Sequence, residues 1–294
     1  FLNKLNIPVV TTWLATDILY YKHPLNLGNL GRSGNRSAVY SVQECDLLLN
    51  FGSRLTTKVV TNEKTFAKKA KVISFDIDNA ELNQGLIKFH KGFQVDLKDF
   101  IPDFYKYLVS KKYKYNYKNE WRARILDLKN NNYAIDETIK SKNPKYVSPY
   151  KFMQNLFEVS SNKAIFIPDA GMNITWTYQG NRLKKGQKIF TGLGASPMGY
   201  ALPASIGAYY ATKSNQVVVL AGDGGFQMNI QELQALAFHN LPIKVFILNN
   251  ESLGNTRFPA QRLFGNSTGN DVKGGYGWPD FVKVAKAYNI KSMN

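Results

Sequence analysis

The chain has 294 residues, which is enough for about two domains. Its apolar and aromatic share of 44% is ordinary for a globular protein and excludes a disordered chain. The 38 basic and 21 acidic side chains give a net charge of +17, which would suit nucleic acid or an anionic membrane. Because no basic nucleic-acid motif is present, we expect lysines spread over solvated faces and no nucleic-acid partner.

A single cysteine, Cys45, excludes an internal disulfide framework and indicates a reducing compartment. No run approaches the roughly 20 apolar residues that a membrane helix needs. These features predict a cytoplasmic protein with no membrane partner. The chain starts at Phe1 rather than Met, and a helical pattern runs to its last residues, so we expect a segment of a longer protein.

The first part of the chain alternates short apolar runs with amphipathic stretches, which predicts parallel α/β architecture. Three runs predict buried strands, at residues 7–12, 45–52 and 71–78. Residues 100–108 have the periodicity of a helix, which we expect to close this unit. We therefore predict a first domain over residues 1–110.

Residues 111–147 have a different composition, because charge and tyrosine content rise and strand signals vanish. We interpret them as a linker that contains a helix with inward-facing aromatic side chains. The alternative is a single-stranded nucleic-acid site, in which basic side chains neutralise the backbone and aromatic side chains stack on the bases.

A second α/β domain is predicted over residues 148–294. It begins with an amphipathic helix over residues 148–160, for which Ser148 is the expected N-cap and Pro149 the first helical residue. Strands are predicted at residues 164–171, 187–192, 216–224 and 242–250, and helices at residues 196–212 and 229–240. The predicted fold class is therefore α/β, with two doubly wound parallel-sheet domains.

Two polar side chains follow neighbouring predicted strands. Asp223 comes directly after the strand at residues 216–224, and Asn250 ends the run at residues 242–250. Ligands of open parallel sheets bind at the carboxyl ends of the strands, and a right-handed crossover brings two such ends together. A carboxylate and an amide oxygen suit Mg²⁺ or Ca²⁺, and Mg²⁺ leaves further positions to water and phosphate. Either feature alone is more often a turn or a strand cap, but together they predict a metal–diphosphate site.

The segment from residue 222 to residue 250 resembles the thiamine-diphosphate motif, in which Gly-Asp-Gly, a helix and a strand precede Asn-Asn. Its sequence is GDGGFQMNIQELQALAFHNLPIKVFILNN. The surrounding chain is similar to the acetolactate synthase (acetohydroxyacid synthase) family. The segments that carry this likeness are IPVVTTWL, HPLNLGNLG, ECDLLLNFGSR, KVISFDIDNAELN and GLGASPMGYALPASIGA. The resemblance implies a central Rossmann-like domain followed by a thiamine-diphosphate-binding domain.

The resemblance also implies roles for individual residues. Asp223 and the Asn250 side chain would bind Mg²⁺, with the Ser252 carbonyl as a third ligand. Gly222 opens the same cofactor-binding turn, and the backbone N–H groups of the next glycines would hold phosphate oxygens; these are Gly224 and Gly225. A second loop matches another phosphate-binding loop, formed by Gly171, Met172 and Asn173. The family usually has Gln-His at the last two of these positions, so the contact differs here.

A third segment matches the part of the family that holds the middle of the cofactor. Met198 stands where a bulky apolar residue wedges between the two rings of thiamine diphosphate and bends it. The Ser196 carbonyl would accept a hydrogen bond from the aminopyrimidine amine. The same segment looks like a dinucleotide fingerprint, but Pro197 replaces its third glycine, so we reject that reading. A core methionine at a helix start is the structural alternative for Met198.

Two features depart from the family pattern. Pro259 stands where acetolactate synthases typically carry a tryptophan that shapes the acceptor pocket. Arg257 is a candidate for binding a substrate carboxylate, and the alternative is a surface arginine near a mobile lid. In the first domain Gly52, Arg54 and Asp76 fit turns of the family's FAD-binding domain, whereas residues 31–34 do not. FAD is therefore a second cofactor that the resemblance leaves open.

The leading functional hypothesis is thiamine-diphosphate- and Mg²⁺-dependent decarboxylation of a 2-oxo acid with carboligation to an acceptor carbonyl. The alternatives are a 2-oxo acid decarboxylase, a C–C hydrolase of the same superfamily, and a catalytically silent cofactor-binding module. In the family, the activating glutamate lies on a separate N-terminal domain, so no catalytic residue is assigned in this segment. The family's site lies between subunits, which implies a homodimer or tetramer.

Overall fold

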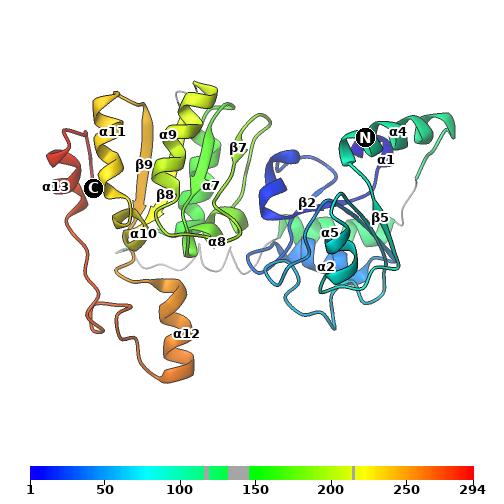
Figure 1. The fold of residues 1–294 in the computed structure, drawn as a ribbon, viewed down its shortest axis with the longest axis horizontal. Helices are drawn as coiled ribbons and strands as arrows, with labels where there is room; N and C mark the ends of the chain where they lie inside the picture. Colours follow the sequence, from blue (N-terminus) through cyan, green and yellow to red (C-terminus); the bar gives the residue numbers. More distant parts are fainter. Residues whose placement is uncertain (116–118, 132–145, 214–215) are drawn as a thin grey trace. The chain divides into compact units, whose positions relative to one another are not determined.

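The computed structural model describes residues 1–115, 119–131, 146–213 and 216–294, apart from the side chain of Gln84. The chain divides into two compact units, Phe1–Ser141 and Lys142–Asn294 (Figure 1). Within the described residues, every pairing between two named strands is parallel. The predicted fold class is confirmed. The predicted boundaries of the two domains and of the linker remain predictions.

The first unit contains two small parallel sheets. β1 (Val9–Thr11) pairs with β2 (Asn26–Asn29), and the second sheet has the order β3 (Leu47–Phe51), β4 (Lys71–Asp76), β5 (Lys91–Gln94). The described helices of this unit are α1 (Leu2–Leu5), η1 (Trp13–Ile18), α2 (Arg36–Glu44), α3 (Asn79–Gln84), α4 (Leu97–Ser110) and α5 (Asn119–Asn130). All three predicted strands are present, with narrower bounds than the apolar runs that predicted them.

The sequence pattern missed β2 and β5. β2 reads Asn-Leu-Gly-Asn, and its Gly28 has a φ of 99°. All four residues of β5 are exposed. β2 is largely buried, but two of its three buried residues are asparagines and it contains a glycine, so it leaves no continuous apolar run. β5 is exposed and is held by backbone hydrogen bonds to β4, so it leaves no apolar signature either. The expectation of a buried strand was wrong at the start of β3, where Leu47 is 47% exposed.

α4 contains the predicted helix and begins at the N-cap Asp96, whose side chain accepts a hydrogen bond from the Lys98 N–H group. It is not the last helix of the unit, because α5 packs against α2. Arg124 of α5 pairs with Glu44 at the end of α2, and Ile125 is buried. The α5 part of the predicted linker therefore packs on the first unit, and residues 116–118 and 132–145 of the linker lie outside the described residues.

The second unit begins as the sequence predicts. α7 (Pro149–Val159) has Ser148 as its N-cap, and the Ser148 hydroxyl accepts a hydrogen bond from the Lys151 N–H group. The sheet has the order β7 (Lys188–Ile189), β6 (Ile165–Pro168), β8 (Val217–Gly222), β9 (Ile243–Leu248). The other helices are α8 (Met172–Gln179), α9 (Ala201–Thr212), α10 (Asp223–Gln227), η2 (Ile230–Glu232), α11 (Leu233–Phe238), α12 (Gly254–Phe264) and α13 (Phe281–Ala287). All four strands and the three helices predicted in this unit are present.

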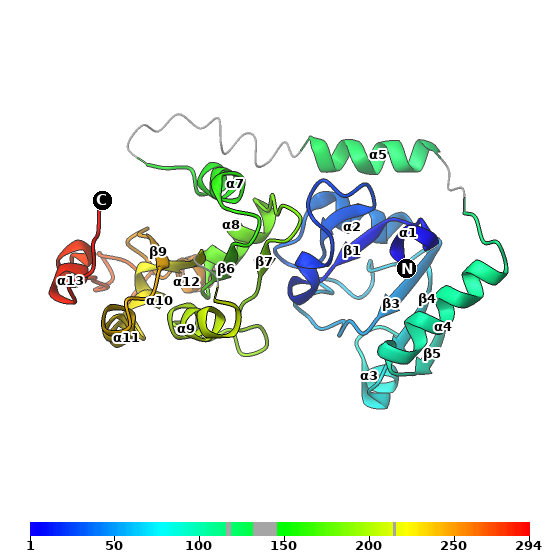
Figure 2. The ribbon, with the colours of Figure 1, turned by 90° about the horizontal axis from the view of Figure 1, so that it is seen from above.

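Helices cover both faces of this sheet, with α7 and α8 on one face and α9 and α11 on the other (Figure 2). The two central strands, β6 and β8, are almost entirely buried. Beneath α7, the rings of Phe157 and Phe166 pack with their centroids 4.5 Å apart. Among the described residues, no helix is long and apolar enough to cross a bilayer.

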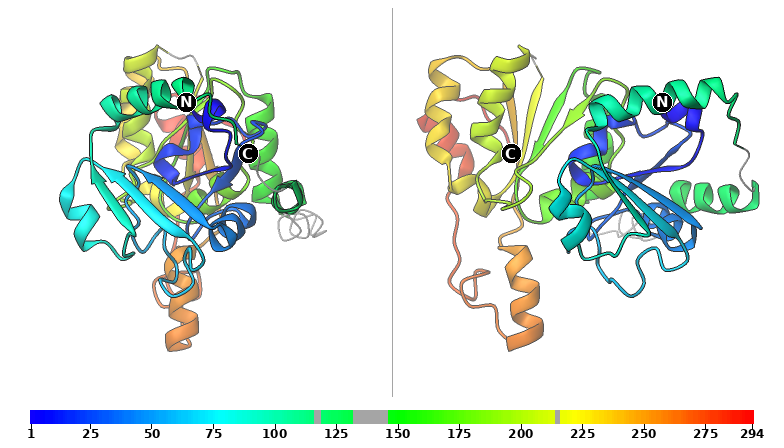
Figure 3. Two further views of the ribbon diagram at one scale, coloured as in Figure 1. Left: turned by 90° about the vertical axis from the view of Figure 1, so that its right-hand side faces the viewer. Right: turned by 45° about the vertical axis from the view of Figure 1, so that its right-hand side comes forward.

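The parallel strands of the second unit bring their carboxyl ends to one edge. Pro168 of β6 is level with Leu220 of β8, and Gly222 of β8 is level with Leu248 of β9. The residues that follow these strands therefore emerge side by side. α12 lies beyond this edge of the sheet (Figure 3).

Replacing Phe166 by alanine should lower the free energy of unfolding of the second unit by about 3–5 kcal/mol, because its ring is fully buried and would leave a cavity. The matched control is Phe238→Ala, since Phe238 is 73% exposed and its loss should cost less than about 0.5 kcal/mol. The free energy of unfolding of each variant is measured by urea denaturation, with hydrogen exchange of the β6 and β8 amides as the readout. Equal losses in the two variants would contradict the assigned core.

Candidate functional site

Three oxygen-bearing groups meet at the carboxyl ends of β8 and β9. One of the two terminal atoms of the Asn250 carboxamide, either its nitrogen or its oxygen, lies 3.0 Å from Asp223 Oδ1 and 2.9 Å from the Ser252 carbonyl oxygen. With nitrogen at that position, the carboxamide donates a hydrogen bond to each oxygen. With oxygen there, three oxygens face one another, and only a cation between them would make this arrangement favourable.

The separations fit a small divalent cation. Mg²⁺ holds oxygen ligands at about 2.0–2.1 Å in octahedral geometry, so two adjacent ligands are about 2.9 Å apart. The two separations at Asn250 have this size. The predicted metal ligands Asp223, Asn250 and Ser252 are therefore brought together by the fold, and the set is of the hard-oxygen kind that Mg²⁺ prefers. Their role as ligands remains a prediction.

The carboxylate of Asp223 is deeply buried, with 1% of the residue exposed. Burial raises the pKa of this carboxyl above its ordinary value, while a hydrogen bond from the Tyr276 hydroxyl and backbone N–H groups, including that of Gly224, act in the opposite direction. The Tyr276 hydroxyl donates to Oδ2 over 3.1 Å. A buried anion of this kind gains more from a bound cation than an exposed one would.

The glycines after Asp223 keep the surrounding chain close. A Cβ atom on Gly224 would lie 2.4 Å from Leu253 Cδ2, 3.1 Å from the Tyr276 hydroxyl and 3.2 Å from Met198 Cε. These three side chains therefore converge over the Gly224 backbone. Met198 itself is 38% exposed, so this predicted wedge residue is not a core methionine.

The second predicted phosphate loop lies against the same edge. Gly171 has a φ of 93°, and a Cβ atom there would meet nothing within 4 Å, so its backbone faces open space. Asn173 is buried beside Gly222, and its Oδ1 has no hydrogen-bond partner among the described residues. Met172 Cγ lies 3.4 Å from the position of a Cβ atom on Gly254, near Asn250. An open glycine beside an unsatisfied polar atom fits a bound polar group.

Asp169 is a site residue that the sequence analysis missed. It follows β6, is 1% exposed, and accepts hydrogen bonds from the N–H groups of Ala170 (2.8 Å), Gly199 (3.0 Å) and Tyr200 (3.2 Å). Burial raises its carboxyl pKa, against these N–H donors. Asp169 thus fastens the segment that carries Met198 to the tip of β6. An acid directly after a buried strand was the available signal.

Ser196 lies in the same segment, between β7 and α9, with a φ of 50°. Its N–H group donates to the Gly192 carbonyl over 2.9 Å. Gly199, three residues after Ser196, makes two backbone hydrogen bonds. Asn229 Nδ2 donates to its carbonyl oxygen over 2.9 Å, and its N–H group donates to Asp169. The segment is therefore fixed both at the end of β6 and at Asn229, the N-cap of η2, next to the Asp223 turn.

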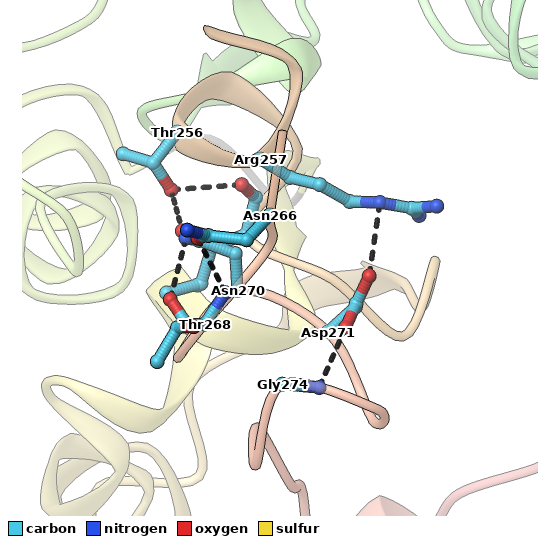
Figure 4. A network of polar contacts seen from close by, with 8 residues as sticks. Thr256, Arg257, Asn266, Thr268, Asn270, Asp271 and Gly274 are labelled. Carbon is cyan, nitrogen blue, oxygen red and sulfur yellow. Dashed lines mark hydrogen bonds and ion pairs between the residues drawn. The ribbon is translucent and has the colours of Figure 1, made fainter. Parts of the chain in front are cut away.

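Arg257 lies on α12, and its Nε atom is 3.2 Å from Asp271 Oδ2 (Figure 4). Asp271 Oδ1 accepts a hydrogen bond from the Gly274 N–H group over 2.8 Å. Thr256 and Asn270 form a second contact between the same two segments. The Arg257 side chain is thus engaged within the chain, which favours the structural alternative over a substrate carboxylate.

Other metal chemistry has little support in the described part of the chain. No group of three or more His, Cys, Asp or Glu side chains there is arranged to hold a metal ion. The predicted site at Asp223 has a single carboxylate, and a Mg²⁺ ion there would take its remaining ligands from amide and backbone oxygens, water and phosphate.

Two family models match this chain. "Thiamine pyrophosphate enzyme, central domain" matches residues 1–103, and "Thiamine pyrophosphate enzyme, C-terminal TPP binding domain" matches residues 169–294. The second match contains every predicted metal and cofactor-binding position.

Similar proteins include a probable acetolactate synthase large subunit of Methanocaldococcus jannaschii, 32% identical over 97% of this chain and 48% of that protein. The acetolactate synthase large subunit of Lactococcus lactis is 33% identical over 100% of this chain and 49% of its own length. The isozyme 1 large subunit of Escherichia coli is 32% identical over 85% of this chain and 43% of its own length. The chain spans about half the length of these relatives.

Gly225→Ala should destabilise the second unit by about 1–3 kcal/mol, because the new Cβ atom would lie 2.3 Å from Asp169 Oδ2. Asp169 cannot move without losing its three backbone hydrogen bonds. Gly207→Ala is the matched control: Gly207 lies within α9 with nothing near its absent Cβ atom, so alanine should stabilise by about 0.5–1 kcal/mol. Thermal unfolding measures the stability of both variants. Melting-temperature shifts of the same sign in the two would contradict the predicted clash between a Cβ atom at residue 225 and Asp169.

Proposed function

Because the chain belongs to the thiamine pyrophosphate enzymes, we propose that the protein decarboxylates a 2-oxo acid and joins the product to an acceptor carbonyl, as an acetolactate synthase does. The proposed cofactors are thiamine diphosphate and Mg²⁺. The observation that carries the proposal is the meeting of Asp223, Asn250 and the Ser252 carbonyl at adjoining strand ends, with the spacing of Mg²⁺ ligands.

The residues of this chain would bind and orient the cofactor. Asp223, Asn250 and Ser252 would hold the metal, which in turn fixes the diphosphate. The N–H groups of Gly224 and Gly225 would reach phosphate oxygens at the tip of β8. Thiamine diphosphate, when bound, supplies an electron sink that lets a 2-oxo acid lose carbon dioxide.

A second group of residues would set the shape of the cofactor. Met198 lies over Gly224 and would press against the bound cofactor, and Asp169 keeps the Met198 segment in position. Ser196 would offer its carbonyl oxygen to the cofactor amine. The buried, unpartnered Oδ1 atom of Asn173 is a further polar group that a ligand at this edge would satisfy.

The proposal for the whole protein includes features outside this segment. No residue here is assigned as the catalytic base. A homodimer or tetramer and a cytoplasmic location belong to the same proposal. FAD could be a second cofactor, because Gly52 and Arg54 stand at turns that match the family's FAD-binding domain. In this structure Arg54 pairs with Glu81, and none of the proposed residue roles requires FAD. An absorption spectrum of the purified protein tests for it.

Asp223→Ala should abolish the binding of thiamine diphosphate with Mg²⁺ to the full-length protein, measured by titration calorimetry. The variant removes the one carboxylate of the proposed site, and loss of a metal ligand leaves the diphosphate unanchored. Asp103→Ala is the matched control, because this exposed carboxylate lies on α4 in the first unit and forms an exposed ion pair with Lys106. Wild-type affinity in Asp223→Ala would refute the metal assignment. Binding by the wild type without turnover of any 2-oxo acid would indicate a silent module, and no binding by the wild type would refute the proposed cofactor.

Incubation of the full-length protein with pyruvate, thiamine diphosphate and Mg²⁺ should yield acetolactate. Pro259 lies inside α12, where the family resemblance expects a tryptophan at the acceptor pocket, so the acceptor is the feature most open to change. Acetaldehyde as the main product would instead favour a decarboxylase. A separate incubation with a diketone in place of pyruvate tests the C–C hydrolase, which would cleave the diketone without ligation. Product analysis by mass spectrometry distinguishes the three.

A further inference from the structure

The segment of residues 266–276, here called the latch segment, crosses back from the end of α12 to the Asp223 turn. Its last residue, Tyr276, donates its hydroxyl hydrogen bond to Asp223 Oδ2 over 3.1 Å. We propose that Tyr276 is a positioning residue for the metal-binding carboxylate, and that the latch segment sets the divalent-cation affinity of the site. This inference rests on the proposed function, since it assumes that Asp223 binds the cation.

The two oxygens of the Asp223 carboxylate face different partners. Oδ1 lies 3.0 Å from the Asn250 carboxamide, at the proposed metal position, and Oδ2 receives the Tyr276 hydroxyl. A carboxylate with one oxygen fixed cannot rotate about its Cβ–Cγ bond without breaking that hydrogen bond. Tyr276 therefore holds Oδ1 toward the cation position, as outer partners of metal ligands commonly do.

The latch segment also holds a second proposed ligand. Asp271 forms an antiparallel bridge with Ser252, and the Leu253 N–H group donates to the Asn270 carbonyl over 2.9 Å. These contacts fix the backbone that presents the Ser252 carbonyl. One segment thus supports two of the three proposed ligands, Asp223 and Ser252.

The latch segment is itself anchored to α12. Arg257 Nε pairs with Asp271 over 3.2 Å (Figure 4). The Tyr276 N–H group donates to the Asp271 carbonyl over 2.9 Å. Asp271 is therefore the connection through which α12 fixes both Ser252 and Tyr276. The ion pair with Asp271 therefore gives Arg257 a structural role that requires no contact with substrate.

The chemistry of Tyr276 suits a permanent donor. Its phenolic hydroxyl is uncharged at neutral pH and has one proton to donate. It also touches the glycine turn, because its oxygen lies 3.1 Å from the position of a Cβ atom on Gly224. Only a glycine at that position leaves room for the contact.

The test is Mn²⁺ binding to the full-length protein with thiamine diphosphate, followed by the paramagnetic resonance signal of free Mn²⁺. Tyr276→Phe removes the donor and keeps the ring, so the dissociation constant for Mn²⁺ should rise about 10–100-fold. Tyr150→Phe is the matched control, because it removes a hydroxyl that donates to Gln179 over 2.7 Å on α7, away from the site. The control should bind as the wild type does.

A double-mutant cycle separates positioning from general stabilisation. In an Asp223→Asn background, Tyr276→Phe should have little further effect on Mn²⁺ affinity, since the carboxylate that Tyr276 orients is gone. An undiminished effect in that background would overturn the inference. Wild-type affinity in Tyr276→Phe would also overturn it, and if Asp223→Ala then still abolishes binding, the proposed function stands. Unchanged binding in Asp223→Ala overturns both.

The anchor is tested in the same assay with Asp271→Asn. Loss of its charge weakens the pair with Arg257, and we expect the Mn²⁺ dissociation constant to rise, while the melting temperature of the cation-free protein changes little. The cation-induced rise in melting temperature should shrink in parallel. Wild-type Mn²⁺ affinity in this variant would remove the anchor from the inference.

Discussion

The second unit is organised around a buried carboxylate at the tip of its central strand. An anion such as Asp223 cannot remain charged out of water unless donors or a cation surround it. The fold supplies backbone N–H groups, the Tyr276 hydroxyl and, at Oδ1, the position that faces Asn250 and Ser252. The glycine turn follows from the same constraint, because side chains at Gly224 would displace the groups that converge there.

Asp169 and Asp223 are buried acids at the tips of neighbouring strands, but they have different roles. Asp169 receives backbone N–H donors from its own turn and from the Met198 segment, so its role is to fasten chain to chain. Asp223 also accepts backbone N–H and Tyr276 hydroxyl hydrogen bonds, but its Oδ1 faces the Asn250 carboxamide beside the Ser252 carbonyl oxygen. A carboxylate beside an amide and a backbone carbonyl is the arrangement expected of a cation site, whereas the Asp169 carboxylate meets backbone N–H donors.

The two units differ in how their sheets are held. In the second unit β6 and β8 are buried on both faces, and the hydrophobic effect fixes their register. In the first unit β2 and β5 contribute short, polar or exposed strands. The cofactor chemistry proposed here is assigned to residues of the second unit, where strand ends are fixed most firmly.

The sequence by itself determined the α/β class, the strands with continuous apolar runs, and the positions of Asp223 and Asn250 at successive strand ends. These follow from local patterns: periodicity, turn residues and the rule that parallel strands end at one edge. Tertiary structure alone decided that Asp169 reaches Gly199 and that Arg257 turns to Asp271. It also decided that Tyr276, 53 positions away, supports Asp223. Such contacts join segments far apart in the chain, and no periodicity encodes them; only packing of the completed sheet brings them within hydrogen-bonding distance.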